Sequence, residues 1–131
     1  MGDDPTLDRE RLSVPNTASS IATARDFVRT SLAEAAPGAI DDIVLVTSEL
    51  VTNSVEHGEG AEVEVATWIT PNDVIVSVAS DSSALPAPAS GHAPVDDLTG
   101  RGLRIVSALS DEVAVIGQGS AVRVECRFRR R

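Results

Sequence analysis

The stretch that decides the fold of this chain is SELVTNSVEHG, residues 48–58, together with the apolar residues that precede it. Apolar side chains recur at helical spacing from residue 43 onward, which predicts a helix over residues 39–57. Glu49, Asn53 and His57 are separated by four residues each, so they form one polar line along a helix whose other faces are apolar. Gly58 is typical of the residue that follows a helix end.

This polar line carries the residue types of phosphate and Mg²⁺ chemistry. A carboxylate and an amide one turn apart can converge on a ligand, and the oxygen of Asn53 suits Mg²⁺, a hard cation that keeps several waters. Glu49 can accept a proton from a hydroxyl or water that attacks a phosphate. The ordinary alternatives are that the line is the solvent face of the helix and that His57 only caps its end. Spacing alone leaves both interpretations open.

The rest of the chain predicts an α+β fold around this helix. Strands come in adjacent pairs and do not alternate with helices, which favours a two-layer sandwich with helices on one face of a mixed, mostly antiparallel sheet. A single domain over residues 1–131 is expected, with a loose tail at 1–8 and a long loop at 82–99. The expected strands are 9–14, 62–69, 74–79, 113–116 and 122–128, and two further helices run from residue 17 to about 36 and from the glycine pair at 100–102 to 109.

Two further positions can contact a nucleotide. Asp81 follows an apolar strand, and a carboxylate there can accept a hydrogen bond from an exocyclic amine such as that of adenine. Gly100, Arg101, Gly102 and Leu103 open the third helix, where free N–H groups and the helix dipole favour a phosphate. Asp is also common where strands end, and a glycine pair can be only a flexible joint.

Composition excludes several classes of protein. The net charge of −9 disfavours nucleic-acid binding, and all eleven basic residues are Arg, so a Walker A lysine is absent. Cys126 is the only cysteine, which excludes an internal disulfide and a cysteine-rich zinc site and predicts an inert, buried thiol. No apolar run reaches the length of a membrane span and no signal peptide is visible, so a cytoplasmic protein is expected. The basic run at 127–131 is expected to be a solvated chain end.

In this order, the features resemble the histidine-kinase-like ATPases of the gyrase/histidine-kinase superfamily, which have the Bergerat fold. The resemblance covers residues 12–128 and is closest to the bacterial anti-sigma-factor serine/threonine protein kinases. Its most specific stretches are SELVTNSVEHG at 48–58 and GRGLRIV at 100–106. The cofactors that it implies are ATP and Mg²⁺.

The resemblance also implies roles for individual residues. Glu49 matches the general base, Asn53 matches the Mg²⁺ ligand among the ATP phosphates, and Asp81 matches the carboxylate that recognises the adenine amine. Residues 82–99 match the ATP lid. The phosphate-facing segment is matched by Gly100, Arg101 and Gly102, and the start of its helix by Leu103. His57 matches a recurring histidine to which we assign no catalytic step.

The function that the resemblance implies is regulation of transcription. Such a protein phosphorylates a serine of an anti-anti-sigma partner and alternately sequesters a sigma factor, and it can form a homodimer through its N-terminal strand. Two departures support an alternative, a nucleotide-sensing or catalytically weakened adaptor: the family's Asp-x-Gly is Asp81-Ser82-Ser83 here, and its Gly-Lys-Thr is Gly119-Ser120-Ala121. The loss of one or two polar contacts costs about 1–3 kcal/mol of binding free energy.

Overall fold

The computed structural model describes residues 9–57, 60–81, 101–118 and 121–131, and the predicted elements are found there in the predicted order. The elements are β1 (Glu10–Pro15), α1 (Ser20–Leu32), α2 (Ile40–His57), β2 (Glu62–Ile69), β3 (Asp73–Asp81), α3 (Arg101–Leu109), β4 (Glu112–Gln118) and β5 (Ala121–Arg129). The predicted tail at 1–8 and lid at 82–99 lie outside the described residues.

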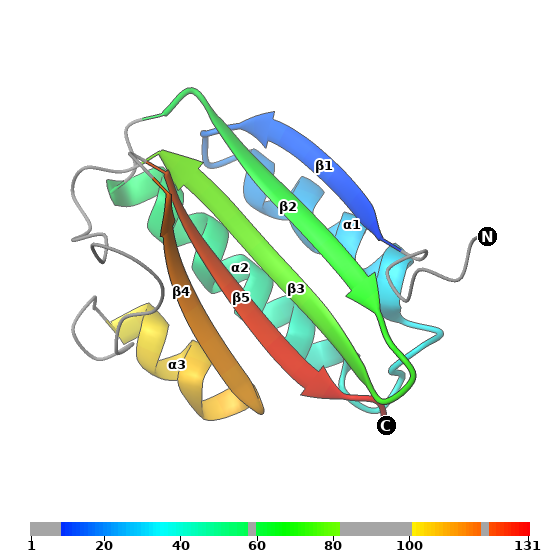
Figure 1. Cartoon of the computed structure of the whole chain (residues 1–131). Helices are drawn as coiled ribbons and strands as arrows, with labels where there is room; N and C mark the ends of the chain where they lie inside the picture. Colours follow the sequence, from blue (N-terminus) through cyan, green and yellow to red (C-terminus); the bar gives the residue numbers. More distant parts are fainter. Residues whose placement is uncertain (1–8, 58–59, 82–100, 119–120) are drawn as a thin grey trace.

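The strands form one sheet in the order β1-β2-β3-β5-β4 (Figure 1). Each neighbouring pair in this order is antiparallel. The α+β class is confirmed, and the helices form a layer on one face of the sheet. The described strands form an antiparallel sheet and not the mixed sheet that the sequence predicted. The reason is that β2–β3 and β4–β5 pair as hairpins and β5 returns antiparallel to β3.

Alternation along the strands decides which face of the sheet the helices cover. In β5, Val122, Val124, Cys126 and Phe128 are buried and the residues between them are only partly buried. The buried set belongs to the same hydrophobic core as the apolar face of α2, including Ile43. Figure 1 shows the helices on one side of the sheet. Each buried aliphatic side chain contributes about 1.5–3 kcal/mol to the free energy of unfolding. The alternation of buried residues in the strands therefore holds α2 on the face of the sheet where they are buried.

Helix α2 lies in the middle of the helix layer, between α1 and α3 (Figure 1). It contacts both helices and also the central strand β3. Among the described residues, no helix combines the length and the apolar character that crossing a bilayer requires.

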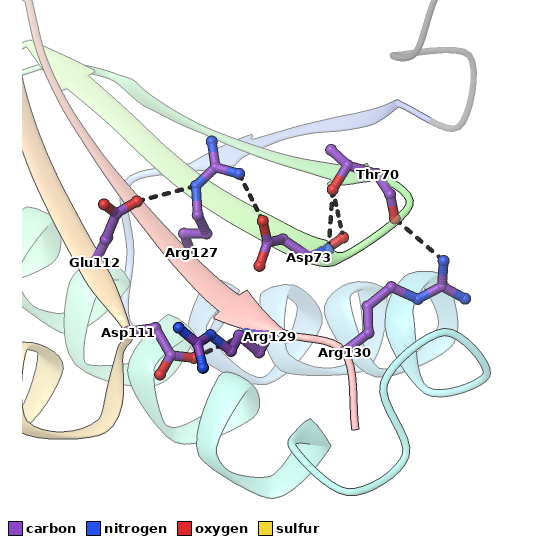
Figure 2. A network of polar contacts seen from close by, with 7 residues as sticks. All are labelled: Thr70, Asp73, Asp111, Glu112, Arg127, Arg129 and Arg130. Atoms are coloured by element: carbon purple, nitrogen blue, oxygen red, sulfur yellow. Dashed lines mark hydrogen bonds and ion pairs between the residues drawn. The ribbon is translucent and has the colours of Figure 1, made fainter.

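The basic C-terminal run is exposed at 129–131, as expected, but its arginines also contact the rest of the fold (Figure 2). Arg127 forms ion pairs with Asp73 at 2.9 Å and Glu112 at 3.3 Å. The Arg130 guanidinium donates to the backbone oxygens of Ala35 at 3.0 Å and Thr70 at 3.1 Å. These contacts form because β5 continues to Arg129, so that the arginines lie beside the β2–β3 turn and the α1–α2 connection.

Candidate functional site

Glu49 and Asn53 of the polar line lie on the flank of α2 that points away from α1. Val44 lines a groove of about 170 Å³ with residues of α1, so this side of α2 points to α1. Asn53 follows nine residues later, about two and a half helical turns, and therefore lies on the opposite flank, with Glu49 one turn earlier. Both side chains are partly buried, and Leu45, one turn before Glu49 on the same line, is 44% exposed. The line is therefore exposed at Leu45 and partly buried at Glu49 and Asn53.

The start of α3 supplies the third predicted feature. The helix begins at Arg101, which leaves the first backbone N–H groups without partners inside the helix and gives this end a partial positive charge. Since α3 contacts α2, the structure brings this short helix to the flank that carries Glu49 and Asn53. Gly100 lies outside the described residues, as do the side chains of His57, Arg101 and Leu103 and the surroundings of Gly102, so their predicted roles stay predictions.

Asp81 lies at the last position of β3 and its side chain is exposed. Val74, Val76 and Val78 of this strand are buried on the face that the helices cover. Because side chains alternate along a strand, this face next receives Ser80, and Asp81 belongs to the opposite face. The structure thus places the α2 line and Asp81 on different faces of the sheet.

On that opposite face, Asp81 contributes to a shallow depression of about 510 Å³. The depression is lined by Ser13, Ala61, Glu62, Glu64, Ala79, Ser80, Asp81 and Ala121. Three of these side chains are carboxylates, so this surface has an acidic character, which disfavours the approach of an anionic ligand.

Sequence reasoning missed a residue that joins the two regions. The Asn16 side chain accepts a hydrogen bond from the Ser54 hydroxyl at 3.2 Å and donates one to the Gly60 oxygen at 3.2 Å. Its backbone N–H also donates to the Ala61 oxygen at 2.9 Å. Ser54 follows Asn53 in α2, and the Gly60 N–H faces the Asp81 oxygen at 3.4 Å. Asn16 therefore connects the turn of α2 that carries Asn53 to the end of β3, and no local sequence pattern indicates these distant partners.

The donor set on α2 fits Mg²⁺ held jointly with phosphates. Glu49 and Asn53 offer oxygen atoms, which this cation prefers, and their partial exposure leaves room for the waters that it retains. Among the described residues there is no group of three or more His, Cys, Asp and Glu side chains that can hold a metal.

Cys126 takes no part in chemistry at this site, as predicted. The thiol is fully buried in the core, and this burial raises its pKa to about 12. The neighbouring Ser110 hydroxyl lowers the pKa by less, and the Glu125 charge raises it slightly further. The thiol is therefore protonated at neutral pH and is neither a nucleophile nor a metal ligand.

Two comparisons with known proteins fit this geometry. The family model of the histidine kinase-like ATPase domain matches residues 14–126. The chain is also similar to the crystal structure of the RsbU and RsbW domains of Rv1364c from Mycobacterium tuberculosis, with 23% sequence identity and a TM-score of 0.69. The match covers 92% of this chain and 31% of that one, so this chain spans about a third of its length. No curated protein sequence matches the chain.

Proposed function

This chain belongs to the histidine kinase-like ATPase domain family, and from this membership we propose that it binds Mg²⁺-ATP between α2 and α3 and acts as an anti-sigma-factor-type serine/threonine protein kinase. The observation that carries the proposal is the flank of α2 opposite α1, where Glu49 and Asn53 are partly buried. Within a fold of this family, that flank offers the oxygen ligands and the proton acceptor that phosphoryl transfer needs.

The residues of α2 divide the chemistry between them. The side-chain oxygen of Asn53 would hold Mg²⁺, which would neutralise charge on the phosphates. Glu49 accepts the proton of the attacking serine hydroxyl while the new O–P bond forms and the bond from the γ-phosphorus to the bridging oxygen of ADP breaks. The N-terminal end of α3 offers backbone N–H groups to the phosphate oxygens.

The regulatory partner is proposed on narrower grounds. The two motifs resemble anti-sigma-factor kinases, and the fold is similar to that of a structure that contains an RsbW domain. An anti-anti-sigma protein is then the phosphorylated partner and a sigma factor the sequestered one. A homodimer and a cytoplasmic location remain predictions of the sequence.

A catalytically weakened adaptor is the second candidate, because Asp81 lies on the sheet face away from α2. If adenine recognition is weakened by that placement, the protein can sense nucleotide or titrate a partner without transferring phosphate. The two candidates differ in whether a serine of the partner becomes phosphorylated.

The test is phosphoryl transfer from radiolabelled ATP to candidate anti-anti-sigma proteins. We expect Glu49→Ala to reduce transfer by about 10²–10⁴-fold, because a general base contributes this much, while Mg²⁺-ATP binding measured by calorimetry is retained. Glu34→Ala is the matched control, since Glu34 is an exposed carboxylate in the α1–α2 connection. Transfer at the normal rate by the Glu49 variant refutes the base assignment, and binding without any transfer by the unaltered protein favours the adaptor.

A further inference from the structure

The end of β3 presents two polar side chains to opposite sides of the sheet. Ser80 pairs with Val63 in β2 and with Val122 in β5. Both valines are buried in the core that α2 covers. Cross-strand partners share a face of the sheet, so Ser80 lies on the α2 side, directly after the buried line that ends at Val78.

Asp81 is held on the other side by its neighbours. It pairs with Ala121, which alternates with the buried Val122 and so belongs to the open face. A Cβ atom on Gly60 would lie 3.0 Å from the Asp81 Cβ and 3.2 Å from its Oδ2, so the backbone of Gly60 sits directly against this carboxylate. Glu62 and Glu64 line the same depression as Asp81, and Ser80 also borders it, so it is the strand register that assigns Ser80 to the α2 side.

A nucleotide bound by α2 must lie on the face that α2 covers. A base that extends from phosphates at Asn53 toward the end of β3 therefore meets Ser80, whereas the Asp81 carboxylate is separated from it by the strand itself. The carboxylates beside Asp81 also give its surroundings a negative charge, which repels an anionic nucleotide.

We infer that Ser80, and not Asp81, is the β3 residue that contacts the purine base, and that this protein discriminates weakly between adenine and guanine nucleotides. A carboxylate only accepts hydrogen bonds, so it selects the 6-amino group of adenine. A serine hydroxyl donates and accepts, so it suits the 6-amino group of adenine and the 6-oxo group of guanine equally. This inference rests on the proposed nucleotide binding and specifies its base selectivity.

The experiment is calorimetric titration of the full chain with Mg²⁺-ATP and, separately, Mg²⁺-GTP. The unaltered protein should bind both with Kd values within about tenfold of each other, since one shared hydroxyl contact carries little discrimination. Asp81→Asn should leave both Kd values unchanged. Ser80→Ala should weaken both by about 2- to 10-fold, the equivalent of one neutral hydrogen bond. Ser80→Asp should favour ATP over GTP by at least about tenfold, because it restores a pure acceptor.

A strong ATP preference that disappears in Asp81→Asn overturns the inference and leaves the proposed function intact. Equal affinities that Ser80→Asp does not shift also overturn it. If neither nucleotide binds the unaltered protein at millimolar concentration, both the inference and the proposed function fail. If Ser80→Asp does not fold, as judged by circular dichroism, the comparison of Ser80→Ala with Asp81→Asn decides the question.

Discussion

The buried thiol of Cys126 predicts a stability change at alkaline pH that no other side chain produces. The chain has no Tyr, and its basic residues are all Arg, so Cys126 alone among the side chains titrates between pH 9 and 12. Burial raises its pKa in the folded state from 9.0 to about 12, with a smaller opposing effect from the neighbouring Ser110 hydroxyl and a small further increase from Glu125. Above pH 9 the unfolded chain has lost this proton and the folded chain keeps it. The free energy of unfolding therefore falls as pH rises, by about 1.4 kcal/mol per pH unit and by about 2.7 kcal/mol at pH 11.

Urea unfolding at pH 8, 9, 10 and 11 measures this loss. The fluorescence of Trp68, the single tryptophan, can report the transition, because Trp68 packs in β2 with the Arg9 guanidinium 4.5 Å from its ring centre. Cys126→Ala is the control: it has no thiol to ionise, so its free energy of unfolding should be lower at pH 8 but independent of pH up to 11. A flat profile for the unaltered protein, or the same slope in the alanine variant, refutes the assignment of a buried, protonated thiol.

Two further predictions concern the contacts that hold the chain ends and the site together. Asn16→Ala removes two side-chain hydrogen bonds and leaves the buried Ser54 hydroxyl unpaired, so we expect Tm to fall by roughly 4–11 °C. The control is Asn72→Ala, which removes an exposed amide and should change Tm little. Equal Tm values for the two variants contradict the connecting role of Asn16. Gly38→Ala places a Cβ 2.7 Å from the backbone carbon of Arg131, so it should lower Tm in the full chain. The same substitution should lower Tm by less in a chain from which Arg131 is deleted. An equal decrease of Tm in both backgrounds shows that this contact is unimportant.

Most of the fold was predictable because each element has a strong period. The alternation of Val63, Val65 and Thr67 gave β2 its buried face, and the structure buries all three. The apolar line of α2 likewise predicted the helix and its ends within one residue. For the basic C-terminal run, charge predicted the exposure of 129–131 but not the partners that a neighbouring turn and helix connection provide.

Less of the site was predictable, because it depends on contacts between distant segments. Glu49 and Asn53 were identified from spacing, yet the flank that they occupy depends on α1 and α3. Asn16 and Ser54 are 38 positions apart, and no local pattern connects them. The face of Asp81 was not predicted, because the expected strand at 74–79 ended before it. The extension of β3 to Asp81 continues the alternation of the valines at 74, 76 and 78 to Ser80 and places Asp81 opposite.

The distribution of exposure around α2 is the reason to regard this helix as functional and not only structural. An ordinary amphipathic helix gives its most exposed positions to polar residues and buries apolar ones. Here an apolar residue, Leu45, is 44% exposed, while Glu49 and Asn53, one and two turns further along the same line, are partly buried. Withdrawing a carboxylate and an amide from water costs free energy unless a partner compensates them. In the proposed site, a Mg²⁺-nucleotide between α2 and α3 supplies that compensation.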